Sequence, residues 1–79
     1  MTFVGQYRGD RSNMLADVLI DKGQLQLQIS GKKHALFAGT PLHFYQEGEF
    51  LKANFDSAVK PRKMVIENFF GVENFARIQ

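Results

Sequence analysis

Apolar and polar residues alternate along most of this chain. The clearest run is Gln24–Ile29, in which glutamines alternate with two leucines and an isoleucine. Because successive side chains of a β-strand point to opposite faces, the apolar residues of this run share one buried face. A second apolar run, Leu15–Asp21, ends at the turn-forming residues 21–23. The two runs therefore predict a β-hairpin in which Gly23 adopts a positive φ angle.

The same rhythm continues over the whole chain. Eight candidate strands are separated by short segments rich in turn residues, and they cover residues 3–8, 15–21, 24–29, 34–38, 42–46, 50–55, 63–70 and 72–78. Turn signals about every 8–12 residues are typical of an all-β barrel or sandwich. The nearest helical candidate, 54–60, is short and runs into Pro61, which disfavours helix in the residue before it. Because the turns are short, we expect an antiparallel, up-and-down sheet.

Closure of this sheet into a barrel would remove its two edges and bury its apolar face. In a closed barrel the first strand, with Gly5-Gln6-Tyr7, pairs with the last, with Phe75-Ala76-Arg77-Ile78. We therefore expect Tyr7 to lie against Arg77 with a cation–π energy of about 0.5–2 kcal/mol, while the guanidinium binds carbonyl groups at the barrel end. The predicted fold is one domain over residues 1–79, an all-β, small, eight-stranded, antiparallel up-and-down barrel with a calycin-like or lipocalin-like plan.

Composition limits what this domain can do. A domain of 79 residues buries only about 60% of the surface that its unfolded chain exposes. The chain has no cysteine, which excludes disulfides, thiolate catalysis and cysteine-ligated zinc. Self-association or docking on a larger protein is the remaining way to supplement the core. A hydrophobic fraction of 44% argues against disorder, and a net charge of +2 is too small to indicate a polyanionic partner. No apolar stretch approaches the roughly 20 residues of a membrane span.

The residues that would close the barrel also carry a family resemblance. Gly5, Tyr7 and Arg77 resemble the closing device of lipocalins and their calycin relatives. Over almost its whole length the chain resembles the small carboxy-terminal β-barrel domain of penicillin-binding-protein-like serine hydrolases of the class C β-lactamase group. The matching positions are Phe3, Gly5, Tyr7, Asp21, Gly23, Leu25, Leu27, Gly31, Leu36, Leu42, Phe44, Phe50, Phe55, Phe75, Arg77 and Ile78. The resemblance implies an accessory domain without a cofactor, because that family's serine, lysine and tyrosine lie in a preceding domain.

Two matches to the Ser-x-x-Lys nucleophile pattern occur, at Ser30 with Lys33 and at Ser57 with Lys60. The chemistry requires a serine at the start of a helix with the lysine one turn later. Ser30 falls in a predicted hairpin turn and Ser57 in a polar loop, so we expect no catalytic residue in this chain.

Histidines and basic residues suggest two further sites. His34 and His43, with Glu47 or Glu49, would make a metal site only if their strands brought them together, and nothing in their spacing requires this. Basic clusters, at Lys32-Lys33 and at Lys60, Arg62 and Lys63, accompany the aromatic residues Phe37, Tyr45 and Phe69. Such interleaving is used to bind single-stranded nucleic acids. Acidic residues nearly cancel the basic ones, so a nucleic-acid partner remains an alternative only. We expect no metal site.

Aromatic residues are the remaining candidates for binding. We expect them to fill the narrow lumen rather than to leave a cavity. If a small apolar ligand binds, the residues expected to contact it are Tyr7, Phe44, Phe55, Phe75 and Arg77. The predicted function is a non-catalytic binding module that contacts a protein partner or a second copy through outer aromatic residues or an open barrel end. A carrier of a small apolar ligand and a single-stranded nucleic-acid binder are the alternatives. We expect a cytoplasmic location for a complete chain, and a periplasmic or other extracytoplasmic one for a piece of a serine hydrolase.

Overall fold

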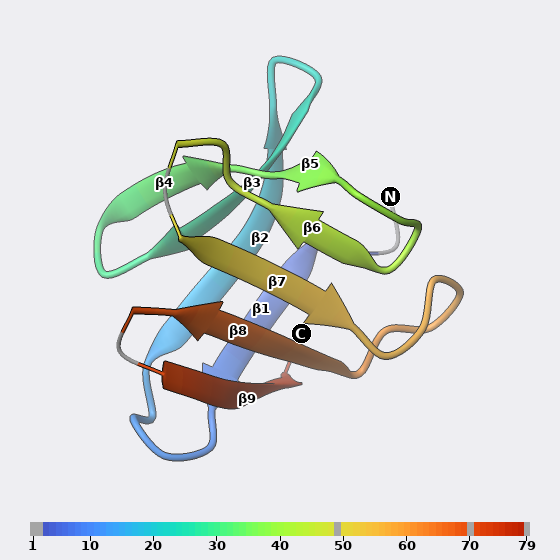
Figure 1. Cartoon of the computed structure of the whole chain (residues 1–79). Helices are drawn as coiled ribbons and strands as arrows, with labels where there is room; N and C mark the ends of the chain where they lie inside the picture. Colours follow the sequence, from blue (N-terminus) through green and yellow to red (C-terminus); the bar gives the residue numbers. More distant parts are fainter. Residues whose placement is uncertain (1–2, 49, 70, 79) are drawn as a thin grey trace.

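The computed structural model describes residues 3–48, 50–69 and 71–78, and it consists of antiparallel strands joined by turns and loops (Figure 1). Nine strands occur in the described residues: β1 Gly5–Gly9, β2 Leu15–Asp21, β3 Gln24–Ile29, β4 Lys32–Ala35, β5 Phe37–Ala38, β6 His43–Tyr45, β7 Leu51–Phe55, β8 Lys63–Asn68 and β9 Gly71–Arg77. These same residues contain no helix. The all-β prediction is confirmed.

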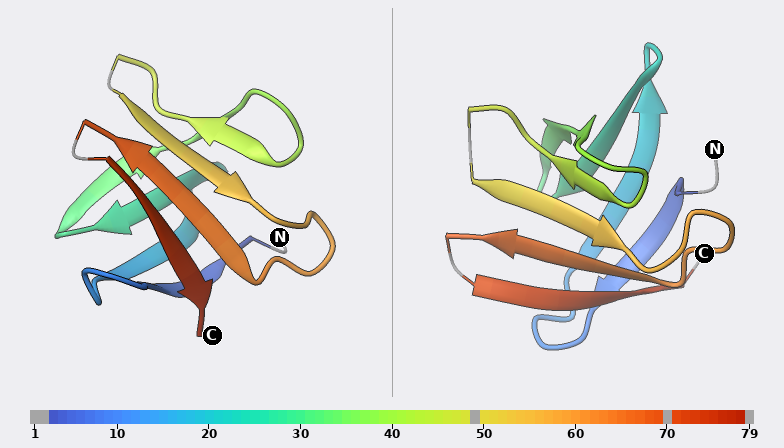
Figure 2. Two further views of the ribbon diagram at one scale, coloured as in Figure 1. Left: turned by 60° about the horizontal axis from the view of Figure 1, so that its bottom comes forward. Right: turned by 45° about the vertical axis from the view of Figure 1, so that its right-hand side comes forward.

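The nine strands form one sheet in the order β4-β3-β2-β1-β9-β8-β7-β6-β5. Strands that follow one another in the chain are neighbours, apart from β4 and β5, which confirms the up-and-down plan. The first and last strands pair antiparallel with Tyr7 opposite Arg77. The sheet curls around on itself into a nearly closed barrel (Figure 2).

The predicted strand 34–38 is divided into two strands, which corrects the count from eight to nine. The chain bends at Leu36, whose side chain is 2% exposed and whose backbone N–H donates to the Leu25 carbonyl at 2.9 Å. Before the bend β4 pairs with β3, and after it β5 pairs with β6. Burial of Leu36 therefore accompanies the passage of the chain from β4, at one edge of the sheet, to β5, at the other edge. The two edges are brought close together, and the barrel nearly closes.

The other predicted strands agree with the structure to within a few residues at each end. The predicted strand 63–70 becomes β8, which pairs with β9 as an antiparallel hairpin. The sequence-based predictions also include five residues that lie outside the described part of the chain: Met1, Thr2, Glu49, Phe70 and Gln79.

Two tight turns set the register of the hairpins. Lys22 and Gly23 have φ angles of 53° and 78°, and Ser30 and Gly31 have φ angles of 54° and 77°. Positive φ at both central residues defines the type I′ turn, whose twist matches that of the flanking strands. The positive φ predicted for Gly23 is confirmed.

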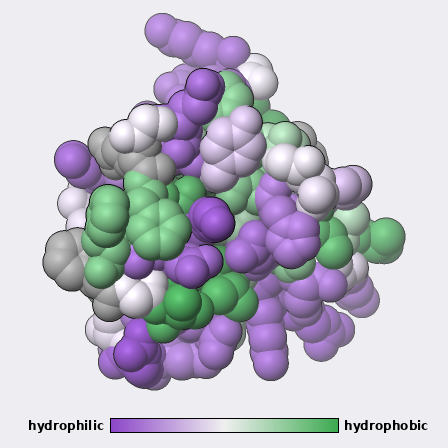
Figure 3. Space-filling model, viewed as in Figure 1, coloured by the Kyte–Doolittle hydropathy of each residue, from purple (hydrophilic) through white to green (hydrophobic). Residues whose placement is uncertain are grey.

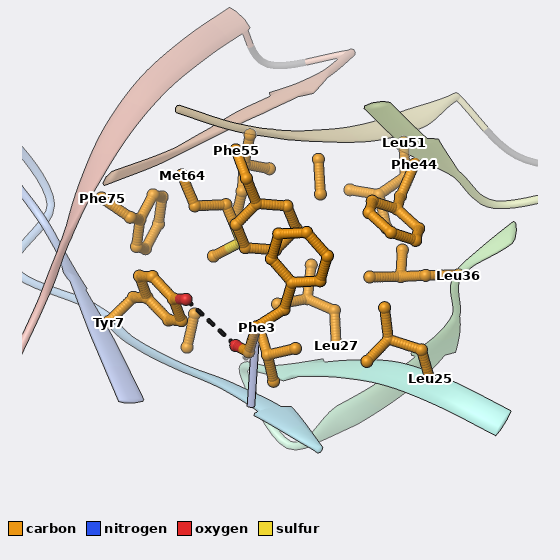
Figure 4. Close-up of a cluster of buried hydrophobic side chains, with 14 residues drawn as sticks. Phe3, Tyr7, Leu25, Leu27, Leu36, Phe44, Leu51, Phe55, Met64 and Phe75 are labelled. Carbon is orange, nitrogen blue, oxygen red and sulfur yellow. Dashed lines mark hydrogen bonds between the residues drawn. The ribbon is translucent and has the colours of Figure 1, made fainter. Parts of the chain in front are cut away.

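Side chains fill the interior of the barrel, as predicted (Figure 4). Phe3 lies before β1 and folds inward, where its ring centre is 4.3 Å from that of Phe55 and 5.3 Å from that of Phe44. The Tyr7 hydroxyl donates to the Phe3 carbonyl at 3.0 Å, and the tyrosine side chain is completely buried. Burial raises the pKa of Tyr7, and the nearby positive charge of Arg77 partly opposes this rise. The interior is thus apolar, with its buried hydroxyl satisfied.

Candidate functional site at the open end of the barrel

Up-and-down strands place their connections alternately at the two ends of a barrel. The β1–β2, β3–β4, β6–β7 and β8–β9 connections therefore lie at one end, which we call the open end. The chain before β1, the chain after β9 and the remaining connections lie at the other end, which we call the closed end. The two ends differ in how side chains cover the core.

At the closed end, Arg77 covers the core together with Phe3. The guanidinium donates to the Val4 carbonyl at 2.7 Å and to the Pro61 carbonyl at 3.2 Å. Its central carbon lies 5.8 Å from the centre of the Tyr7 ring. The predicted contact of Tyr7 with Arg77, and the predicted binding of carbonyls by the guanidinium, are both confirmed.

At the open end, the structure has a pocket of about 330 Å³. Five apolar side chains line it: Met14, Ile29, Ile66, Val72 and Phe75. Polar residues at its border are Arg11, Ser30, Asn68 and Glu73. Its volume lies at the lower limit of ligand pockets, which typically have mostly apolar walls and a few polar groups at fixed positions.

Glu73 binds the β1–β2 loop, which forms one wall of this pocket. One carboxylate oxygen of Glu73 accepts hydrogen bonds from the Ser12 backbone at 2.8 Å, the Ser12 hydroxyl at 2.8 Å and the Arg11 backbone at 3.0 Å. The Arg11 guanidinium donates to the Val72 carbonyl at 2.5 Å. These bonds hold the loop against β9, so that Met14 stays beside the pocket.

The electrostatics of this clamp favour the charged form of the Glu73 carboxylate. Hydrogen bonds from Ser12, above all from its backbone N–H, lower the pKa of Glu73 below its usual value, and Arg11 adds to the effect. A Cβ atom at Gly9 would overlap the Glu73 carboxylate, so a larger residue there would displace the clamp. The positive charge of Arg11 and the negative charge of Glu73 offset each other, so the border of the pocket is nearly neutral.

Two exposed rings stand beside the pocket. Phe69, in the β8–β9 connection, is 82% exposed, and its ring centre lies 5.2 Å from that of Phe50 in an edge-to-face arrangement. Phe69 follows Asn68, which itself borders the pocket. We call Phe50 and Phe69 the aromatic ridge. Figure 3 shows apolar side chains gathered at the left, over the start of β7 and the end of β8.

The residues predicted to contact a ligand lie in different places. Phe75 reaches the open-end pocket. Tyr7, Phe44 and Phe55 are buried in the core, where the Phe55 ring contacts the rings of Tyr7, Phe44 and Phe3 (Figure 4). Arg77 belongs to the closed end. The structure therefore brings one of the five predicted residues, Phe75, to the pocket.

The histidines make separate contacts. His34 Nδ1 lies 2.8 Å from the Gln46 side-chain oxygen, and His43 Nδ1 lies 2.7 Å from that of Asn54. Among the described residues, no group of three His, Cys, Asp or Glu side chains could hold a metal ion. Glu49, one of the acidic residues considered with the histidines, lies outside that part of the chain.

The Ser-x-x-Lys serines lie where the sequence predicts. Ser30 occupies a type I′ turn, and Ser57 lies in the β7–β8 loop, where its hydroxyl accepts from the backbone of Lys60 at 3.1 Å. Neither serine begins a helix.

The two basic clusters lie at opposite ends of the barrel. Lys32 and Lys33 begin β4 at the open end, whereas Lys60, Arg62 and Lys63 lie at or near the start of β8 at the closed end. A nucleic-acid strand would need a continuous basic groove. The two basic clusters are too far apart along the barrel to form one such groove.

The clamp was not predictable from local sequence patterns, because Ser12 and Glu73 are 61 residues apart. Comparisons with protein families, with curated proteins and with solved structures find no match. In the described part of the chain, no helix has the length and apolar character to cross a membrane.

Proposed function

We propose that this protein is a non-catalytic binding module that contacts a protein partner through the open end of its barrel. One observation carries the proposal: Asn68 and Gly71 of the β8–β9 connection border an apolar pocket of about 330 Å³, and Phe69 in the same connection is 82% exposed. A hollow and a projecting ring side by side suit an interface in which each partner inserts a side chain into the other. Buried aromatic anchors of this kind supply much of the energy of protein interfaces.

Charge supports a protein partner at this end. Arg11 and Glu73 compensate each other at the border of the pocket, so an apolar side chain could enter without removing an unpaired charge from water. The polar residues around an apolar centre match the usual anatomy of an interface. The resemblance to an accessory domain of serine hydrolases makes a hydrolase domain the first partner to test, and a second copy of this chain is the next.

Photo-crosslinking tests this proposal directly. A photoreactive phenylalanine analogue at position 69 should form a discrete protein adduct, identified by mass spectrometry, either with a coexpressed hydrolase domain or with a second copy. The matched control carries the analogue at position 59, because Val59 is 84% exposed but lies at the closed end. No adduct from position 69, or the same adduct from both positions, would contradict the proposal.

Self-association has its own measurement. Sedimentation velocity over a range of concentrations should show a dimer that Phe69→Ser weakens and Val59→Ser does not, if the partner is a second copy. A monomer at all concentrations, together with a position-69 adduct to a hydrolase domain, assigns the site to that other protein.

A small apolar ligand in the same pocket is the second candidate function. The enclosing walls of Ile66, Val72 and Phe75 favour it. Val72→Phe should fill the pocket, because Val72 is on its wall and is half exposed. A medium-chain fatty acid that raises the unfolding temperature of the wild type, but not of Val72→Phe, supports this candidate. Equal shifts in both proteins rule out this pocket as the site.

A further inference from the structure

A second candidate site lies on the outer face of the barrel, away from the open-end pocket. Strands β6, β7 and β8 lie side by side there, and their outward side chains form two rows across the sheet. One row contains Tyr45, Lys52 and Glu67, and the other contains His43, Asn54 and Val65. In Figure 3, polar side chains lie over the middle of this face.

These rows border a shallow groove of about 390 Å³. The Tyr45 ring is 40% exposed and forms one side of the groove. Gly39 lies beside this ring: a Cβ atom there would be 3.8 Å from its edge. Because Gly39 has no side chain, that edge of Tyr45 is left uncovered. The Phe37 ring, with its centre 6.1 Å from that of Tyr45 and a tilt of 39°, extends the aromatic surface.

The groove carries donors and acceptors without a net charge. Lys52 and Glu67 are direct cross-strand partners, so a cation and an anion offset each other. The Lys52 ammonium lies 5.9 Å from the centre of the Phe50 ring, at the side of the groove nearest the aromatic ridge.

The His43 contact adds two further polar groups in a fixed orientation. The Asn54 side-chain oxygen, 2.7 Å from His43 Nδ1, can only accept a hydrogen bond, so Nδ1 carries the proton. In the neutral imidazole this leaves Nε2 as an acceptor, and the Asn54 amide nitrogen as a donor. The groove thus offers an ammonium and an amide as donors, and a carboxylate and an imidazole nitrogen as acceptors.

We propose that this groove binds a neutral saccharide. A sugar ring has an apolar face of C–H groups that packs on an aromatic ring, and hydroxyl groups that both donate and accept hydrogen bonds. Tyr45 supplies the first feature, and Lys52, Asn54 and Glu67 supply the second. The absence of net charge favours a neutral sugar, because the Glu67 carboxylate offsets the attraction that the Lys52 ammonium would exert on a phosphate-bearing ligand.

This proposal is independent of the function proposed for the open end. The groove lies on the barrel wall, and the residues that border it are separate from those of the pocket and the aromatic ridge. A shallow single site of this kind should bind with a dissociation constant on the order of 1 mM for an oligosaccharide.

The experiment is a titration of the ¹⁵N-labelled protein with maltohexaose, cellohexaose and chitohexaose, followed by NMR. At least one sugar should shift the backbone amide signals of Tyr45, Lys52, Asn54 and Glu67 in a saturable way. Absence of saturable shifts with all three sugars at about 20 mM, well above the expected dissociation constant, overturns the proposal.

Variants assign the binding to the groove. Tyr45→Ala should weaken binding about tenfold through loss of the ring, and Glu67→Gln should weaken it about threefold through loss of a charged acceptor. Val59→Ala is the control, because it removes an exposed apolar side chain at the closed end, away from the groove, and it should leave the affinity unchanged. Equal losses from Tyr45→Ala and Val59→Ala would overturn the assignment. Salt-sensitive binding of oligothymidylate to the same amides, without sugar binding, would assign the groove to nucleic acid instead.

Discussion

Arg77 lies directly opposite Tyr7 in the pairing of the last strand with the first, and its guanidinium stands 5.8 Å from the centre of the tyrosine ring. The same guanidinium donates to carbonyls of Val4 and Pro61. One cation therefore connects β9 to the chain before β1 and to the β7–β8 loop. This relationship explains why the closed end of so small a barrel remains sealed.

Replacement of Arg77 should destabilise the barrel. Arg77→Ala removes a cation–π contact and two charge-assisted hydrogen bonds, so the free energy of unfolding should fall by about 2–3 kcal/mol. Urea unfolding followed by circular dichroism measures this loss. Arg8→Ala is the matched control, because Arg8 is exposed on the outer face and should change stability by less than about 0.5 kcal/mol. Equal effects of the two substitutions would show that Arg77 has no special role in closure.

Phe3 seals the same end from within. Phe3→Leu removes ring contacts with Phe44 and Phe55 and leaves a small void, which should cost about 1–2 kcal/mol of the free energy of unfolding. Thermal and urea unfolding should both show the loss. Phe37→Leu, at a ring that is 37% exposed, should be nearly neutral. A neutral Phe3→Leu would mean that Phe3 does not contribute to the core.

The sequence predicts most of this fold because its signals are local. Strict alternation identifies Gln24–Ile29, and glycine at the turns sets the hairpins on either side of it. The division of 34–38 into β4 and β5 has no such signal, since it depends on burial of Leu36 in the core of the folded barrel. A bend caused by tertiary packing cannot be derived from alternation alone.

The open-end pocket was harder to predict for the same reason. Phe75 could be identified because it faces inward on a strand next to the predicted closure. Met14 and Arg11 could not, because their positions depend on hydrogen bonds from the β1–β2 loop to Glu73, about sixty residues later in the chain. Side chains that close a loop on a remote strand leave no periodic pattern in the sequence.

Lys22 offers a stabilising substitution. Its φ angle of 53° lies in the left-handed region, which asparagine adopts more readily than lysine. Lys22→Asn creates the Asn-Gly pair preferred in type I′ turns, so the free energy of unfolding should rise by about 0.5–1 kcal/mol. Lys60→Asn removes the same charge in an exposed loop and serves as the control. A stability gain from Lys60→Asn alone, or from both variants equally, would attribute the effect to charge instead of to backbone conformation.

Acid should weaken the clamp at the open end. Hydrogen bonds from Ser12, together with Arg11, lower the pKa of Glu73 in the folded protein below its usual value of 4.5. The folded state therefore binds this proton less readily than the unfolded state. The resulting stabilisation is fully present above the unfolded pKa, and it is lost as the pH falls through the lower, folded value.

Glu73→Gln tests this linkage. The variant should be less stable than the wild type at neutral pH, and the difference should shrink at acid pH, as the pH falls below 4.5 and the wild-type carboxyl also becomes protonated. Urea unfolding at a series of pH values measures the two curves. Asp10→Asn is the control, since Asp10 lies in the same loop and its side chain makes no hydrogen bond to the described residues. If Glu73→Gln lowered the free energy of unfolding equally at neutral and at acid pH, the clamp would not depend on the carboxylate charge. The position of Met14 at the pocket wall would then require another explanation.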